Sequence, residues 1–333
     1  MTQFVENLMI RASKLSKTIA LAEGTDVRAA KAAEILTQKK VCKVVLIGNE
    51  DEIRSKFPEI DFSGVSFDDP KTSEHRAEYA NTLYELRKAK GMTEEQAFNI
   101  VTTNNMFYAC VALKRGDVDG VVGGAVFSSA DVSRAAFQVI KAAPGISSVS
   151  SCFVMVPPED FKYKKYPAYI FSDCAVIPYP TSDQLADIVV AAADSSKKIC
   201  QTDAKIAMLS FSTKGSANHE SVEKVRVAYQ KVKQEHPEIV VDGELQLDAS
   251  LVDSVANQKA PGSPVAGQAN VLVFPNLDAG NIGYKIAQRF GNCMAIGPIM
   301  QGLALPVNDL SRGCVAEDIA AVAAITVLQS VKD

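Results

Sequence analysis

The chain has 333 residues, which is long for a single hydrophobic core, so two domains are expected. Hydrophobic residues make up 47% and charged residues 22%, an ordinary globular balance, and the net charge of −4 argues against binding to nucleic acid or an anionic membrane. Seven cysteines without a Cys-x-x-Cys pair, together with an N-terminus that lacks a secretory signal pattern, predict reduced thiols in a cytoplasmic protein without a zinc site.

The first part of the chain alternates short β-branched runs with longer helical patterns. The expected strands are 18–22, 43–48 and 118–122, and the expected helices are 26–40 with Asp26 as N-cap, a helix-rich stretch over 73–115, and 129–141. This alternation is typical of parallel α/β sheets, which bind ligands at the carboxyl ends of their strands.

The middle of the chain repeats the alternation. The expected strands are 151–156, 168–172, 205–210, 271–274 and 293–297, and the expected helices are 181–199, 220–235 and 276–290. Loops 157–167 and 257–270 are longer than usual connections and are candidate functional loops. Segment 319–328 is apolar almost all round but too short to span a bilayer, which favours a buried core helix or a subunit-interface helix.

Two strong breaks, Pro144-Gly145 and Gly297-Pro298, mark the expected crossings between domains. We therefore expect a discontinuous first α/β domain, 1–144 plus 298–333, and a second α/β domain, 145–297. In this division the last helix returns to the first domain, which periodicity alone does not establish.

The most informative motif lies at a turn before the last helix. Within eight residues it gathers the hydroxyl of Ser311, the cation of Arg312 and the carboxylate of Asp318. An arginine beside a helix N-terminus is suited to phosphate, a hydroxyl can stabilise an oxyanion, and a carboxylate can take a thiol proton. The alternative is a plain helix start with an N-cap, a solvated arginine and an acid that complements the helix dipole, a role for which Glu317 is equally eligible.

A second motif follows the expected strand 118–122. Gly123 and Gly124 lead through small residues to Ser128 and Ser129, and the next helix carries Arg134. Exposed backbone amides and serine hydroxyls there favour a phosphate site over an ordinary strand-to-helix turn, although neither a Walker loop nor the dinucleotide glycine pattern is present.

Three further groups are open to two interpretations. Arg87 ends a basic helix closed by Gly91, which fits a C-cap, while the functional alternative is an anchor for a polyanionic cofactor tail. Asn281 and Lys285 lie at the start of a helix and fit either a ligand cleft or helix packing. Cys314 has no histidine nearby to activate it, so we expect a buried small hydrophobe instead of a nucleophile.

On these residues the chain resembles the phosphate acetyltransferase (phosphotransacetylase) family in its short form. The resemblance covers essentially all 333 residues and rests on four blocks: 123–126, 278–285, 297–303, and 306–313 with Glu317 and Asp318. It implies two doubly wound α/β domains with an interdomain cleft, like isocitrate and isopropylmalate dehydrogenases, and a homodimer. At Leu305, where the resemblance implies a basic residue, this chain has an apolar one.

The resemblance also implies an activity and its residues. The family interconverts acetyl-CoA plus phosphate and acetyl phosphate plus CoA, with CoA as a substrate and no metal in the active site. Ser311, Arg312 and Asp318 fall on its catalytic residues, and Arg134 and Arg87 on arginines tied to CoA and phosphate. Ser128, Ser129, Asn281 and Lys285 are the accompanying phosphate- or CoA-binding candidates, and Arg28 and Arg289 are further ones.

The hypothetical mechanism is direct attack of the CoA thiolate on the carbonyl of acetyl phosphate. Asp318 takes the thiol proton, Arg312 holds the phosphate, and Ser311 donates to the developing oxyanion. With unperturbed pKa values this proton transfer is uphill by roughly 6 kcal/mol, so we expect cations to stabilise the forming thiolate and proton loss to be partly concerted with attack.

Three other functions compete with this hypothesis. A phosphate butyryltransferase-like enzyme would act on longer acyl groups, and pocket size decides that question. A decarboxylating dehydrogenase would need clustered aspartates for a metal and a nicotinamide site, and no convincing cluster is visible. A catalytically silent CoA-binding module is disfavoured by the complete set of Ser311, Arg312 and Asp318.

Overall fold

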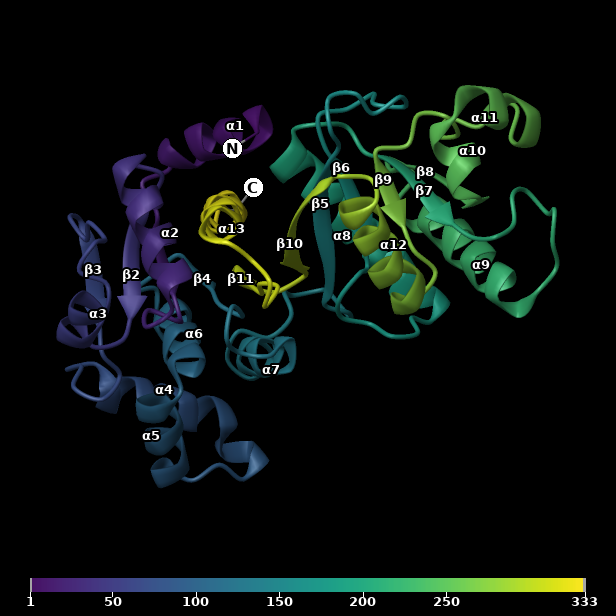
Figure 1. Ribbon diagram of the computed structural model, residues 1–333. Helices are drawn as coiled ribbons and strands as arrows, with labels where there is room; N and C mark the ends of the chain where they lie inside the picture. The colour runs from purple at the N-terminus through teal and green to yellow at the C-terminus, as the bar shows by residue number, and fades with distance from the viewer. Residues whose placement is uncertain (1, 332–333) are drawn as a thin grey trace. The chain divides into compact units, whose positions relative to one another are not determined.

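A computed structural model describes residues 2–331 (Figure 1), and the chain divides into two compact units. Unit 1 comprises the chain up to Pro144 together with the segment from Leu303 onwards, and unit 2 comprises 145–302. The second boundary lies after the break at Gly297-Pro298, because strand β10 (Met294–Gln301) continues through that break with a register shift between Ile296 and Ile299. The strand expected over 293–297 is therefore longer than the sequence predicts.

Unit 1 is built on a five-stranded sheet in which every neighbouring pair is parallel. Its strands, in the order β11-β4-β1-β2-β3, are β11 (Val307–Asn308), β4 (Gly120–Val122), β1 (Thr18–Leu21), β2 (Lys43–Ile47) and β3 (Val65–Asp68). The parallel α/β prediction is confirmed for this unit. β3 and β11 are not predicted, because β3 is short and mostly half-buried and β11 has only two residues.

The helices of unit 1 follow the predicted pattern with finer divisions, except for the helices over 3–13 and 50–56, which are not predicted. They are α1 (Gln3–Ser13), α2 (Val27–Gln38), α3 (Glu50–Lys56), α4 (Arg76–Arg87), the short 3₁₀ turn η1 (Lys88–Lys90), α5 (Glu94–Thr103), α6 (Asn105–Arg115), α7 (Ser129–Val139) and α13 (Ala316–Gln329). Asp26 caps α2 as expected, since its side chain accepts a hydrogen bond from the amide of Arg28.

The last helix, α13, is a core element of unit 1. Ten residues of its apolar run, 319–328, are buried, and the helix packs against α1, α2 and β4. In Figure 1 its yellow ribbon lies beside purple α2, so the two ends of the sequence pack together within this unit. Inside the interface the amide of Asn308 donates to the hydroxyl of Thr326, which satisfies a buried polar pair. Of the two expectations for this segment, the buried core helix is the one observed within the chain.

Unit 2 contains a six-stranded mixed sheet in the order β10-β5-β6-β9-β7-β8. Its strands are β5 (Ser150–Val156), β6 (Tyr169–Ser172), β7 (Lys205–Leu209), β8 (Val240–Leu245), β9 (Val271–Val273) and β10. The β10–β5 and β5–β6 pairs are antiparallel and the others are parallel. The expected parallel pairing therefore holds for β6-β9-β7-β8 but not for β10-β5-β6, where the β5–β6 connection, 157–168, contains no crossover helix.

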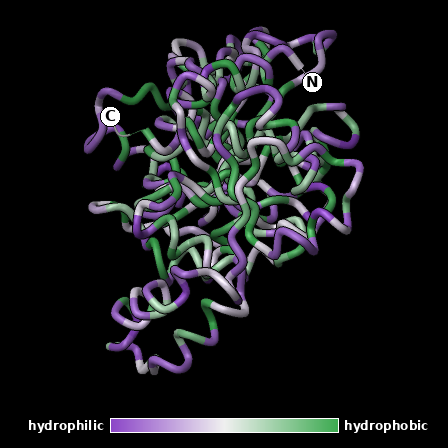
Figure 2. Tube along the Cα trace, turned by 90° about the vertical axis from the view of Figure 1, so that its left-hand side faces the viewer, coloured by the Kyte–Doolittle hydropathy of each residue, from purple (hydrophilic) through white to green (hydrophobic). Residues whose placement is uncertain are grey.

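The helices of unit 2 are α8 (Ser182–Ser195), the π-turn η2 (Ser196–Cys200), α9 (Glu220–Glu235), α10 (Leu247–Leu251), α11 (Asp253–Lys259) and α12 (Leu277–Arg289). α8 begins with a capping box formed by Thr181 and Gln184. Figure 2 shows hydrophobic residues mainly on inner segments and hydrophilic ones mainly on outer loops. Within residues 2–331 no helix combines the length and apolar character needed to cross a membrane.

Candidate active site

Three neighbouring strands of unit 1 bring the principal candidate residues to one edge of the sheet. β11, β4 and β1 are adjacent and parallel, so their carboxyl ends lie together. Glu23 follows β1, the loop 124–127 follows β4, and the segment 309–318 follows β11. This is the edge at which a parallel α/β sheet presents its ligand-binding loops.

Ser311 and Arg312 lie on an exposed tight turn. The amide of Cys314 donates to the carbonyl of Ser311 at 2.9 Å, and the amide of Gly313 donates to the Ser311 hydroxyl oxygen at 3.3 Å. The hydroxyl proton of Ser311 is thereby left free to donate outward. Among the described residues, the guanidinium of Arg312 has no hydrogen-bond or ion-pair partner, so its N–H donors are available to an anion.

Asp318 lies in the first turn of α13 and is half-buried. Its Oδ2 accepts a hydrogen bond from the amide of Val315 at 3.0 Å, which closes the start of the helix. Burial raises the pKa of Asp318 above its ordinary value, the Val315 amide opposes this rise, and the charge of Glu317 adds to it. A carboxylate with a raised pKa is a better proton acceptor for a thiol than an ordinary aspartate.

Cys314 is a buried thiol, as the sequence predicts. Burial raises its pKa to about 11, with Arg28 acting in the opposite direction. The neutral thiol form therefore dominates near pH 7, and a nucleophilic role for Cys314 is not supported.

The backbone amides of the loop 124–127 are already occupied. All four donate to the buried carboxylate of Glu23, with Gly124 and Ala125 bonded to Oε2 and Val126 and Phe127 to Oε1, at 2.7 to 3.0 Å. The idea that these amides bind a ligand phosphate is therefore wrong, because an internal anion holds the same donors. Sequence reasoning missed Glu23, although a carboxylate directly after a buried strand was a usable signal.

Ser128 and Ser129 begin the helix that follows this loop, and Arg134 lies further along it. Ser128 is the N-cap of α7, accepting from the amide of Asp131 and donating to its carboxylate. Arg134 is exposed and pairs with Asp131 at 2.9 Å, an ion pair that water and salt weaken. Arg134 is thus accessible to an anion, whereas the Ser128 hydroxyl is engaged as a cap.

Asp309 is a second carboxyl group that the sequence did not single out. It is buried beside Gly124, and its Oδ1 has no hydrogen-bond partner among the described residues. Burial raises the pKa of Asp309 to about 6, against the opposing effects of Ser129, the amide of Leu310 and Arg312. Asp309 is therefore a buried carboxyl group two residues before Ser311, and it lies close enough to Arg312 to feel its charge.

Gly124 is required by this packing. Its φ is +115°, and a Cβ at this position would lie 2.2 Å from Oδ1 of Asp309 and 2.7 Å from the amide nitrogen of Leu310. Gly124→Ala should lower the free energy of unfolding by at least about 3 kcal/mol, from backbone strain plus overpacking. Gly91→Ala is the matched control, because Gly91 also has a positive φ of +85° but nothing within 4 Å of its Cβ position. Urea unfolding should show the smaller loss for Gly91→Ala, and equal losses would contradict the packing argument.

Arg28 is not free to bind a ligand in the described structure. Its Nε and Nη2 donate to Asp26, Nη2 also donates to the carbonyl of Ala125, and Nη1 donates to the carbonyls of Arg312 and Cys314. An arginine has five N–H donors, and these five bonds use all of them. In the described structure the guanidinium of Arg28 therefore binds groups of the protein itself.

Arg87 lines a small polar pocket at the end of α4. The pocket has a volume of about 360 Å³ and is also lined by Lys90, Gln96 and Asn99. The buried Nε of Arg87 has no hydrogen-bond partner among the described residues. An unpaired cation beside a second lysine and two amides is suited to an anionic group, in line with the anchor interpretation.

The remaining candidates lie in unit 2. Asn281 donates to the carbonyl of Cys174 at 3.1 Å and accepts from Lys285 at 2.7 Å, which favours helix packing for Asn281. Arg289 is exposed in the last turn of α12. Leu305, back in unit 1, packs against the hydrophobic cluster that contains Val307, so an apolar residue is suited to that position.

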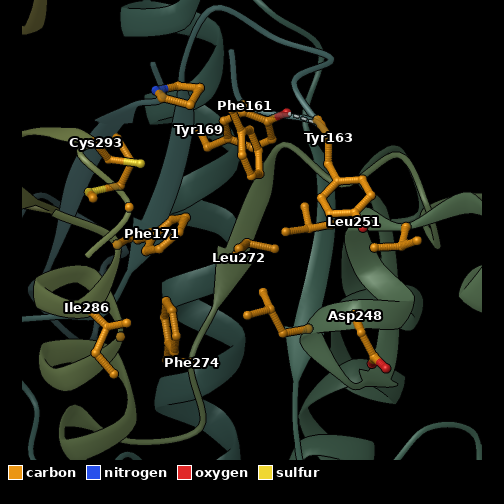
Figure 3. A pocket seen from close by; sticks show the side chains of 17 residues that line it. Phe161, Tyr163, Tyr169, Phe171, Asp248, Leu251, Leu272, Phe274, Ile286 and Cys293 are labelled. Atoms are coloured by element: carbon orange, nitrogen blue, oxygen red, sulfur yellow. Dashed lines mark hydrogen bonds between the residues drawn. The ribbon is translucent and has the colours of Figure 1, made fainter. Parts of the chain in front are cut away.

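Unit 2 also contains an apolar pocket of about 620 Å³ (Figure 3). Aromatic rings from the candidate loop 157–167, from strand β6 and from Phe274, which follows strand β9, line it together with Ile286 of α12. The polar lining is sparse: the carboxylate of Asp248 pairs with Lys259 at 3.0 Å. Within residues 2–331 no group of three or more His, Cys, Asp or Glu side chains is arranged to hold a metal.

Comparison with known proteins agrees with the resemblance. The family model described as phosphate acetyl/butaryl transferase matches residues 3–327. A phosphate acetyltransferase from Acetivibrio thermocellus is 50% identical over 327 residues, 98% of each chain. A phosphotransacetylase structure from Streptococcus pyogenes superposes with a TM-score of 0.91 at 40% identity, over 99% of each chain. A 4-hydroxythreonine-4-phosphate dehydrogenase from Klebsiella pneumoniae, with a TM-score of 0.54, 13% identity and coverage of 94% of this chain and 100% of its own, shares only the fold. The chain belongs to the phosphate acetyl/butaryl transferase family.

Proposed function

We propose that this protein interconverts acetyl-CoA plus phosphate and acetyl phosphate plus CoA. The observation that carries the proposal is the 50% identity to a phosphate acetyltransferase over nearly the full length of both chains. Ser311, Arg312 and Asp318 on one edge of the unit 1 sheet supply the donors and the proton acceptor that this reaction needs.

In the proposed reaction Asp318 takes the proton from the CoA thiol, and the sulfur bonds to the acetyl carbonyl carbon. The bond from that carbon to the phosphate oxygen then breaks, and inorganic phosphate leaves while Arg312 holds it. Ser311 donates its free hydroxyl proton to the carbonyl oxygen as negative charge develops there. The pKa values of an unperturbed thiol and an unperturbed aspartate differ by roughly 4.6 units. The raised pKa of Asp318 makes this difference smaller.

Phosphate and CoA contacts are proposed for Arg134 and Arg87, because both guanidinium groups are accessible or unpaired. Arg134 is exposed and forms an ion pair with Asp131 at the surface. Arg87 has an unpaired Nε beside its polar pocket. Roles in CoA binding for Ser128, Ser129, Asn281, Lys285 and Arg289 stay predictions, as does the cytoplasmic location.

The activity is tested by phosphate- or arsenate-dependent turnover of acetyl-, propionyl- and butyryl-CoA by the purified protein, measured as release of free thiol. We expect the highest kcat/KM for acetyl-CoA. Preference for butyryl-CoA would replace the proposal with the butyryltransferase alternative. Absence of turnover with all three substrates would remove the acyltransferase proposal.

We also propose that the protein is a homodimer that pairs through α12. Ile282, Ile286 and Phe290 are 58%, 53% and 88% exposed at a four-residue spacing, which places them along one side of the helix. Ile286 also lines the pocket of unit 2 (Figure 3). A second copy that paired on the stripe would cover both the stripe and this side of the pocket.

Phe290→Glu should convert the dimer to a monomer, since a buried unpaired carboxylate is costly in an apolar interface. Light scattering after gel filtration should give the wild type twice the chain mass of 35.7 kDa and the variant once that mass. Val227→Glu is the control, because Val227 is 44% exposed on α9 of the same unit. A wild-type monomer, or a dimer that survives Phe290→Glu, would contradict this pairing.

A further inference from the structure

Three segments far apart in sequence are joined at the carboxyl edge of the unit 1 sheet by side chains outside the proposed catalytic set. The segments follow β1, β4 and β11, and they carry Glu23 and Arg28, the loop 124–127, and the turn 311–314. Since β11 has only two residues, its short strand pairing gives little support to the turn that follows it.

The first connection is made by Glu23. This carboxylate is 6% exposed and receives four amide hydrogen bonds from the loop 124–127, two on each oxygen. Four charge-assisted bonds to one buried anion fix the direction of each peptide in that loop. The carbonyl of Ala125 is thereby held at a defined position beside the guanidinium of Arg28.

The second connection is made by Arg28. Its Nη2 reaches the carbonyl of Ala125 at 2.8 Å, and its Nη1 reaches the carbonyl of Arg312 at 2.8 Å and that of Cys314 at 3.4 Å. The carboxylate of Asp26 orients the same guanidinium through Nε and Nη2. One planar group therefore fixes the spacing between the loop 124–127 and the peptide groups of the catalytic turn.

The connection continues to the proposed proton acceptor. Arg28 holds the carbonyl of Cys314, and the next residue, Val315, donates its amide to Oδ2 of Asp318 at 3.0 Å. A displacement of the turn would therefore move both Arg312 and the hydrogen-bond donor of Asp318.

We infer that Arg28, supported by Glu23 and Asp26, is a positioning residue that holds the turn 311–314 in its reactive arrangement and does not bind CoA. This inference rests on the proposed function only for its kinetic consequence. The hydrogen-bond geometry itself is independent of the substrate.

Arg28→Lys tests the inference, because lysine keeps the charge but offers three donors from a single nitrogen and cannot bridge the same acceptors. We expect kcat to fall at least about tenfold, with the KM for CoA within about twofold of wild type, since displaced catalytic groups lose rate more than ground-state binding. A higher KM for CoA at unchanged kcat would make Arg28 a CoA ligand and overturn the inference. Wild-type turnover in the same assay separates this result from failure of the proposed function.

Asp26→Asn provides a second variant that leaves Arg28 in place. Asparagine is as good an N-cap as aspartate, so α2 should still form, while the guanidinium loses its orienting charge. We expect a smaller fall in kcat and an unchanged KM for CoA. If Arg28 instead bound CoA, release of its guanidinium from Asp26 would lower the KM for CoA, and that result would contradict the inference.

A readout without substrate comes from Cys314, the last residue of the turn, which is 7% exposed. Alkylation by iodoacetamide, followed at Cys314 by peptide mass spectrometry, should be at least about fivefold faster in Arg28→Lys and in Glu23→Gln than in wild type, because the turn opens more often. Arg54→Lys is the matched control, since Arg54 lies on α3 and pairs there with Glu50. Unchanged alkylation in Arg28→Lys, at a temperature where circular dichroism shows a folded protein, would overturn the positioning role.

Discussion

Replacement of Asp318 by Asn should lower kcat about 1,000-fold while leaving the KM for CoA nearly unchanged. Loss of a positioned proton acceptor typically costs between about 100-fold and 10,000-fold, and the effect is confined to the transition state. Asparagine keeps an oxygen that can accept the hydrogen bond from the amide of Val315, so the start of α13 should survive. Stopped-flow or steady-state release of phosphate from acetyl phosphate measures both parameters.

The pH dependence of the wild type should report the same carboxyl group. Because burial raises the pKa of Asp318, kcat/KM for CoA should fall as the pH drops through a value above the ordinary pKa of aspartate, and Asp318→Asn should lose this acid limb. The raised pKa of Asp318 has the opposite consequence for the stability of the fold, which falls as the pH rises. A carboxyl group whose folded pKa lies above its unfolded pKa destabilises the fold once the pH rises through the folded value. Asp318→Asn should therefore unfold at the same or a slightly higher temperature at pH 7.

Glu317→Gln is the matched control for this experiment. Glu317 is adjacent and exposed, and its charge contributes to the raised pKa of Asp318. Its replacement should leave kcat near wild type and move the acid limb slightly towards lower pH. A variant Asp318→Asn with unchanged kcat, or a larger loss in Glu317→Gln, would remove Asp318 from the mechanism.

Arg312→Gln should lower kcat by roughly 100-fold to 1,000-fold, the range for loss of one preorganised donor to a developing anion. The guanidinium has no partner among the described residues, so its loss should leave the melting temperature unchanged. Arg312→Lys should lie between wild type and Arg312→Gln, because lysine supplies charge without two parallel donors.

The kinetic signature distinguishes a catalytic Arg312 from an anchor. If Arg312 holds the leaving phosphate, kcat falls and the KM for CoA stays within about twofold of wild type. A higher KM for CoA with little loss of kcat would assign Arg312 to CoA binding and would require another group to stabilise the leaving phosphate.

The sequence pattern alone could predict much of the fold of unit 1. Expected strands 18–22 and 43–48 each end within a residue of the observed ones, and Asp26 caps its helix, because periodicity and capping are local properties. The antiparallel part of unit 2 could not be predicted in this way. The run 151–156 is fully buried, and a buried strand has the same composition whichever way its neighbours point.

The candidate site, too, could be predicted from the sequence only in part. Ser311, Arg312 and Asp318 could be named from the sequence, because a hydroxyl, a cation and an acid are separated by few residues there. The environments of these three side chains could not be predicted from the sequence. The half-burial that raises the pKa of Asp318 depends on how α13 packs, and the backbone amides after β4 are filled by Glu23, about a hundred residues earlier in the chain.

The sequence by itself determined the family, most helices and strands, and the chemical groups available for the reaction, since these follow from residue types and local spacing. Only the tertiary structure decided that Arg28 uses all its donors on the carboxylate of Asp26 and on backbone carbonyls, that Arg312 keeps its donors free, and that Asp309 is buried beside Gly124. The physical reason is that hydrogen-bond saturation and desolvation depend on which distant segments meet at the sheet edge, and no local pattern encodes that meeting.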